Sequence, residues 1–482
     1  MIQSGLPNGT TLSASEQHGL DLLVDLARVV QVMRPSSNVV KLEVTGARKR
    51  AVSVGECVAR GWFIEAADGV VRIDRNALDV VCDIAGASKE QASTKRDRFG
   101  RIPSMQSPLA ATGKERQAVI SRAAMRLRYA VIESAGDRPV RFVAPWPNGH
   151  RWAAAVTHDL DVVSYWPLFS ALRVAELARK RELARATRVL AAACNAIGGS
   201  PVREGVQFIL REEQKHGVRS TWFVLCGTPS FSSWRQGDLT YLPESAQARE
   251  IFADIGLHDG EIGLHGSFET LNRGDAFVEQ RGRLANLAHG PIAGVRQHFL
   301  RLHPATTPTH MAAAGFAYDS SQGFPDRNGF RLGVADVVPT WNASDQRATG
   351  FDEIPFCWMD RSLSKYGGIE DPAEWIDDAE ALAAECRRVE GLWVGVWHPN
   401  LVPALGFPGA PEAFSALLSS LSEGSPYFGT LADILAWRSS RRSVRVRSVG
   451  ADDVIEAELP VATPHEVVLE DGNGVACPTR WL

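Results

Sequence analysis

Two aspartates stand close together at the end of an apolar stretch of this sequence. Thr157, His158, Asp159, Leu160 and Asp161 directly follow AAAV. Because side chains alternate along a strand, we expect Asp159 and Asp161 to project to the same side. Two carboxylates held that close do not both ionise without a cation or a proton between them. We interpret Asp161 as a metal ligand and Asp159 as a general base. A pair of solvated loop aspartates or a helix N-cap would give the same pattern.

Histidines end three other apolar stretches. His265 lies in EIGLHGS, His298 in RQHFLR together with Arg296, and His398 in WHP. A neutral imidazole is a common ligand for divalent transition metals, and an imidazole is also the commonest acid or base in catalysis. Taken singly, each of these residues is equally typical of a structural side chain. Their common position at the end of an apolar stretch makes them candidates for one site.

The elements that must position these residues begin at about residue 152. The apolar stretches there are AAAVTHDLD, STWFVL, EIGLHG, AGVRQHFL, FAYDSS, DEIPF and LWVGVWHP. Helical patterns separate them, and such alternation predicts a parallel sheet with right-handed crossovers. Seven strands in one domain favour a closed or nearly closed (β/α) barrel over an open sheet. Barrels of this type carry their active sites at the carboxyl ends of the strands, where the polar residues stand here.

The chain as a whole divides into four predicted regions of an α/β protein. They are a mixed α+β N-terminal domain at 1–117, a helix and connector at 118–151, the barrel at 152–440 and a small β-rich extension at 441–482. Within the first two regions, helices are expected at 19–33, 76–87 and 117–134 and strands at 38–46 and 69–76, with a polar linker or loop at 87–116.

A long basic helix is expected from about Phe169 to Cys194. Its basic residues are Arg173, Arg179, Lys180, Arg181, Arg185 and Arg188. They could contact an anionic lipid or a phosphorylated substrate, but a solvated helix face is the simpler interpretation.

Composition excludes several classes of protein. The 482 residues are 45% hydrophobic and 22% charged, with a formal net charge of -4, so nucleic acid is not an expected partner. No secretion signal pattern opens the sequence, and no apolar run is long enough to predict a transmembrane segment. The seven cysteines include no CxxC pair, which favours a reduced, cytoplasmic protein.

The ordered series of motifs resembles one known family. Thr-x-Asp-x-Asp, Glu-Ile-Gly-x-His, Arg-x-His, Gly-Phe-x-Tyr-Asp-Ser, Glu-Ile-Pro and His-Pro follow one another as in the polysaccharide deacetylases. The resemblance covers roughly residues 145–440. It implies a distorted (β/α) barrel that holds one divalent ion, usually zinc. It also implies a metal-dependent carbohydrate deacetylase, which removes an N-acetyl or other N-acyl group from an amino sugar of a glycan or glycan precursor.

The resemblance assigns two metal ligands and leaves the third open. Asp161 and His265 match family ligands, although Leu160 stands where the family usually has a second aspartate. Glu269 replaces the second histidine of the family's His-x-x-x-His motif. Either Glu269 or His298 could be the third ligand. We favour His298, because an Asp-His-His set suits zinc.

The resemblance also assigns the catalytic groups. Asp159 matches the general base, Arg296 the arginine that holds this base in place, and His398 the general acid. Two other functions stay open. One is hydrolysis of a non-sugar amide on the same barrel. The other, suggested by the missing second histidine, is a barrel without metal that serves as a binding or scaffolding module.

Overall fold

The computed structural model describes residues 2–4, 11–30, 40–47, 52–138, 140–449, 455–460 and 465–481. Its largest element is a ten-stranded sheet. The strands are β6 (Ala153–Leu160), β7 (Thr221–Leu225), β8 (Glu261–Gly266), β9 (Gly294–Gln297), β10 (Tyr318–Asp319), β11 (Val338–Asn342), β12 (Arg347–Glu353), β13 (Trp358–Met359), β14 (Leu392–Val396) and β15 (Tyr427–Phe428). They pair in the order β11-β12-β10-β9-β8-β7-β6-β14-β13, and β15 pairs with β6.

All pairings in this sheet are parallel except that of β11 with β12. Strands β12 and β13 stand near opposite ends of this order, yet β12 ends at Glu353 and β13 begins at Trp358. So short a connection requires the sheet to curl until its two ends approach each other. The predicted α/β class and distorted barrel are therefore confirmed. Every residue of β6, β7 and β14 is buried. This is expected of parallel strands that helices cover.

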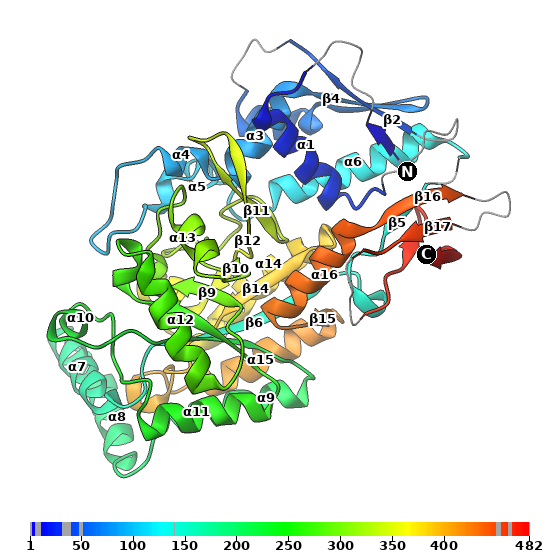
Figure 1. Ribbon diagram of the computed structural model, residues 1–482. Coiled ribbons are helices and arrows are strands. Elements are labelled where there is room, and N and C mark those ends of the chain that lie inside the picture. Colours follow the sequence, from blue (N-terminus) through cyan, green and yellow to red (C-terminus); the bar gives the residue numbers. More distant parts are fainter. Residues whose placement is uncertain are drawn as a thin grey trace.

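Helices surround the sheet (Figure 1). They are α7 (Trp166–Arg179), α8 (Leu183–Asn195), α9 (Pro201–Lys215), α10 (Phe231–Arg235), α11 (Ala246–Leu257), α12 (Asp275–Ala288), α13 (Thr307–Ala313), α14 (Trp375–Arg388), α15 (Ala410–Glu423) and α16 (Leu431–Ser443). Capping residues determine where several of these helices begin. Ser245 caps α11, and Thr430 forms a capping box with Asp433 at the start of α16. No helix among the described residues is long and apolar enough to cross a membrane.

A second sheet lies near the N-terminus, at the end of the molecule opposite α7 and α8 (Figure 1). Its order is β1 (Ile2–Ser4), β2 (Val40–Thr45), β4 (Val70–Asp74) and β3 (Ile64–Ala67). The helices of this region are α1 (Ala14–Leu26), α2 (Val54–Ala59), α3 (Arg75–Ala85), α4 (Ser88–Gln91), α5 (Pro108–Ala111) and α6 (Val119–Ala135).

Near the C-terminus, β16 (Arg445–Val449), β17 (Ile455–Glu458) and β19 (Thr479–Trp481) form a three-stranded sheet, and β18 (Leu469–Glu470) pairs with β5 (Phe142–Val143).

Three sequence predictions about elements need correction. The helix expected from Phe169 to Cys194 is two helices, because the backbone at Arg181 takes a left-handed conformation (φ 61°) between α7 and α8. The helix expected at 19–33 begins earlier and ends at Leu26, and 31–33 lie outside the described residues. The expected linker at 87–116 contains α4 and α5.

Candidate metal centre

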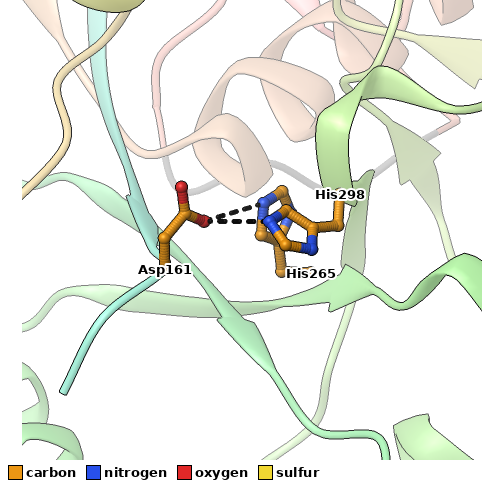
Figure 2. Close-up of side chains that lie close together, drawn as sticks. All are labelled: Asp161, His265 and His298. Carbon is orange, nitrogen blue, oxygen red and sulfur yellow. Dashed lines mark ion pairs between the residues drawn. The ribbon is translucent and has the colours of Figure 1, made fainter. Parts of the chain in front are cut away.

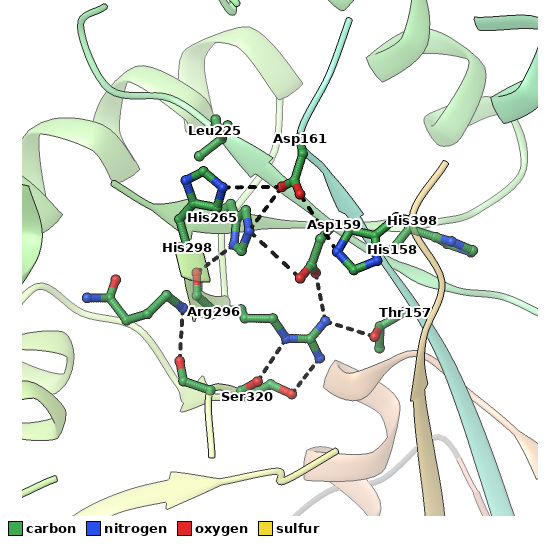
Figure 3. Close-up of polar contacts among 12 residues, drawn as sticks. Thr157, His158, Asp159, Asp161, Leu225, His265, Arg296, His298, Ser320 and His398 are labelled. Atoms are coloured by element: carbon green, nitrogen blue, oxygen red, sulfur yellow. Dashed lines mark hydrogen bonds and ion pairs between the residues drawn. The ribbon is translucent and has the colours of Figure 1, made fainter. Parts of the chain in front are cut away.

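The carboxyl ends of four barrel strands carry the candidate residues to one place. Asp159 lies in β6 and Asp161 directly after it, His265 lies in β8, Arg296 in β9 and His398 shortly after β14. Since these strands are parallel and lie in one continuous part of the sheet, in the order β9-β8-β7-β6-β14, their carboxyl ends share one edge. The convergence is visible in Figure 3.

Three side chains form a compact cluster of potential ligands (Figure 2). Oδ1 of Asp161 lies 3.4 Å from Nε2 of His265 and 3.6 Å from Nε2 of His298. Tetrahedral coordination with bonds of about 2.0–2.2 Å places ligand atoms roughly 3.3–3.6 Å apart. Both imidazoles are buried, and Oδ1 of Asp161 is buried without a hydrogen-bond partner among the described residues. Two of the three separations therefore match such an ion, all three ligand atoms lie within 4.8 Å of one another, and the ligand types suit a divalent metal.

Neighbouring groups orient both imidazoles for this role. Nδ1 of His265 lies 2.9 Å from the carbonyl oxygen of Arg296, and Nδ1 of His298 lies 3.1 Å from Oδ1 of Asp238. A carbonyl oxygen only accepts, so Nδ1 of His265 donates and Nε2 keeps its lone pair when the ring is neutral. The Asp238 carboxylate acts in the same way on His298. Such outer partners are typical of histidines that bind metals.

The sequence left Glu269 and His298 as rival third ligands, and the structure separates them. Glu269 follows β8 in a short 3-10 turn, where its half-exposed side chain pairs with Arg273. His298 lies in the turn after β9 and faces Asp161. The structure thus brings His298 into the cluster, whereas Glu269 lies outside it.

Asp159 lies beside the cluster and is held by an arginine. Nη1 of Arg296 donates to Oδ1 of Asp159 over 2.8 Å, and the same nitrogen donates to Oγ1 of Thr157 (Figure 3). Oδ2 of Asp159 lies 3.8 Å from Nε2 of His265. Burial alone would raise the pKa of Asp159. The charges of Arg296, His265 and His398 outweigh burial and hold this pKa below its ordinary value. Asp159 is therefore an ionised carboxylate in a nearly dry site.

His398 faces the cluster from the other side. Its Nδ1 donates to Oδ1 of Asp360 over 2.7 Å, and its backbone N–H donates to Oδ2 of the same carboxylate over 2.6 Å. Nε2 therefore points inward and lies 3.7 Å from Oδ2 of Asp161. Burial would lower the pKa of His398, but Asp360, together with the charges of Asp161 and Asp159, more than compensates, and the pKa stands above its ordinary value. This imidazole is suited to hold a proton at Nε2.

Two members of the site escaped the sequence analysis. Asp360 follows the apolar run FCWM, so the rule that found the other residues could have found it. Asp238 lies in a loop, 60 positions before the His298 that it holds, and no local pattern marks it. His158 precedes Asp159 and faces the opposite way, where it bonds Glu213 and the carbonyl oxygen of Trp397 in the barrel wall.

Comparisons with known proteins give a similarity of fold. No family model and no curated protein matches the chain. Among solved structures, a protein from Mycobacterium smegmatis described as a polysaccharide deacetylase is 21% identical, with 62% of this chain and 93% of that chain covered and a TM-score of 0.40. A probable polysaccharide deacetylase from Pseudomonas aeruginosa is 13% identical, with 63% and 95% covered and a TM-score of 0.39.

The similar structures also include a pseudoenzyme. It is a CE4-family protein from Bacillus anthracis, 12% identical, with 60% of this chain and 66% of that chain covered and a TM-score of 0.28. The likeness to these proteins is one of fold at low sequence identity. The chemistry assigned to the site therefore rests on its own geometry.

Proposed function

We propose that this chain is a metal-dependent hydrolase that removes an N-acetyl or other N-acyl group from an amino sugar of a glycan or glycan precursor. One observation carries the proposal. A single cavity of about 260 Å³ is lined by three functional groups. They are the ligand cluster, the carboxylate of Asp159, which Arg296 holds, and the imidazole of His398, which Asp360 holds. Amide hydrolysis needs these three functions at one carbon atom: a Lewis acid, a base for water and an acid for the departing amine.

Asp161, His265 and His298 would hold the divalent ion, and we propose zinc because imidazole and carboxylate ligands at tetrahedral spacing suit it. Bound there, the ion would supply Lewis acidity, which polarises a carbonyl group and makes water more acidic.

Asp159 is placed to take the proton from the attacking water. Its carboxylate is ionised, and Arg296 fixes one oxygen so that Oδ2 is left toward the cluster. His398 is placed to return a proton. An amine is a poor leaving group until it is protonated, and Nε2 of His398 is the inward-facing acid with a raised pKa. Each group thus has the protonation state that its step requires.

Acetate release from N-acetylated amino sugars tests this proposal. We expect turnover by the wild-type protein, and losses of at least 100-fold in kcat for Asp159→Asn and His398→Gln at unchanged metal content. If the protein released acid or ammonia only from non-sugar amides, it would still be a hydrolase, but the proposed sugar substrate would be refuted. A protein that binds no metal and releases nothing would support the scaffolding alternative.

A further inference from the structure

Two cations line the catalytic cavity, and no described carboxylate forms an ion pair with either of them. Arg361 and Lys365 border the cavity that contains Asp161, and they come from one short segment, a single π-helical turn at Ser362–Gly367 and the residue before it. Within the described part of the chain, neither side chain forms an ion pair or a hydrogen bond. π-Helical turns are rare and occur often at functional sites.

The carboxylates around this cavity are already engaged. Asp159 pairs with Arg296, and Asp360 with His398. Asp161 belongs to the ligand cluster. Arg101, the third cation of the lining, pairs with Asp97 over 2.7 Å. None of these acids forms an ion pair with Arg361 or Lys365, and Asp161 acts on Lys365 only at a distance.

Aromatic rings do not replace the missing ion pairs. The Arg361 guanidinium lies 5.5 Å from the ring centre of Phe407, and the Lys365 ammonium lies 5.2 and 5.3 Å from those of Phe99 and Phe299. Cation–π contacts at such positions orient a side chain but leave its full charge in place. Although Lys365 is partly exposed, desolvation and the charges of Arg361 and Arg101 outweigh the opposing charge of Asp161 and lower the pKa of this lysine to about 8. A bound anion would oppose that shift.

The two cations also stand at a junction. A second cavity, of about 340 Å³, shares Phe169, Arg361, Lys365 and Asn400 with the catalytic one and continues along α7. Its own charged residues are neutralised by one another: Arg173 and Lys180 pair with Glu176, and Glu370 pairs with Arg185. Each cavity alone is near the lower limit of the ~300–1,000 Å³ typical of small-molecule sites. A ligand that reaches through the junction would place one part beside the ligand cluster and a neighbouring part between Arg361 and Lys365.

We propose that the substrate is an N-acylated amino sugar that carries a phosphate ester, and that Arg361 and Lys365 bind this phosphate at the junction of the two cavities. This inference rests on the proposed hydrolase function. A planar guanidinium matches two phosphate oxygens at once, and the ammonium adds a point charge. The phosphate belongs either to a soluble sugar phosphate or to the diphosphate linkage of a lipid-borne sugar.

The kinetic test compares N-acetylglucosamine 1-phosphate with methyl N-acetylglucosaminide. We expect the wild-type kcat/KM to favour the phosphate at least tenfold, and Arg361→Gln/Lys365→Met to reduce this ratio at least tenfold. Arg179→Gln is the matched control, because Arg179 is an exposed cation of α7 that lines neither cavity, and its ratio should equal that of the wild type. N-Acetylglucosamine linked to polyprenyl diphosphate, offered in detergent micelles, identifies the source of the phosphate. Preference for either phosphorylated form supports the inference.

A binding test separates this inference from the hydrolase proposal. Glucose 1-phosphate has no acyl group to release, so its affinity for the full protein can be measured by calorimetry whether or not turnover occurs. A tenfold or greater loss of affinity in Arg361→Gln/Lys365→Met, at unchanged metal content, would support the phosphate site even if no acetate were released. Equal affinity in both proteins, with equal turnover of neutral and phosphorylated sugars, would overturn the phosphate site and leave the hydrolase standing.

Discussion

Replacement of Asp360 by asparagine tests how His398 is held. Asparagine keeps the shape of the side chain but removes the charge that accepts both from Nδ1 and from the backbone N–H of His398. Because an amide offers one oxygen for these two donors, the imidazole loses its fixed orientation and its raised pKa. A hydrogen bond to a charged group contributes roughly 1.5–3 kcal/mol. Loss of one such bond from the transition state corresponds to a kcat reduced roughly 10- to 150-fold.

The assay for Asp360→Asn is steady-state acetate release together with metal analysis. KM and metal content should stay near wild-type values, because the Asp360 carboxylate accepts from His398 and pairs with neither the ligand cluster nor the side chains of Arg361 and Lys365. Asp336→Asn is the control: Asp336 is also buried and accepts from Arg441 over 2.6 Å, but it lies outside the catalytic cavity. It should lower stability and leave kcat intact. An Asp360→Asn protein with wild-type kcat would refute the role of His398 as acid.

Three further outcomes follow. Arg296→Gln breaks a buried ion pair with Asp159, so it should cost roughly 3–5 kcal/mol in denaturant unfolding and move the acid limb of the kcat–pH profile to higher pH; an unmoved limb would contradict the role of Asp159 as base. Burial raises the pKa of Asp319, beside Glu353, to about 6, so its contribution to stability is fully present below about pH 4 and is lost as pH rises through 6. The free energy of unfolding should fall between pH 5 and pH 8. Glu353→Gln should reduce the part of this fall that comes from Asp319, which is up to about 1.4 kcal/mol because the pKa of Asp319 lies about one unit above pH 5. An equal fall in both proteins would count against a shared proton. Chelation should lower Tm reversibly, because an ion at 1,000 times its Kd adds about 4 kcal/mol, and a Tm indifferent to chelator and to added zinc would speak against an ion-stabilised fold.

The sequence reveals those parts of the fold that depend on apolar patterning. AAAVTHDLD and LWVGVWHP become the adjacent strands β6 and β14 because buried parallel strands require unbroken apolar runs. Strand β13 has two residues, too few to show a period. The break at Arg181 is also invisible, because RKRELAR contains neither glycine nor proline and reads as continuous helix.

The residues of the site likewise include some that the sequence reveals and some that depend on tertiary contacts. Asp159, His265 and His398 could be recognised because the carboxyl end of a parallel strand is where a barrel exposes its side chains. The choice between Glu269 and His298 depends on where a turn directs each side chain. That direction is set by contacts from distant loops, such as the one between Asp238 and His298.

Metal content of three purified proteins tests the central claim most directly. If Asp161, His265 and His298 hold the ion, the wild-type protein and Glu269→Ala should each contain one divalent ion per chain, and His298→Ala should lose most of it. The account would be contradicted if His298→Ala retained the metal and Glu269→Ala lost it. It would also be contradicted if the wild-type protein contained no metal after purification with added zinc.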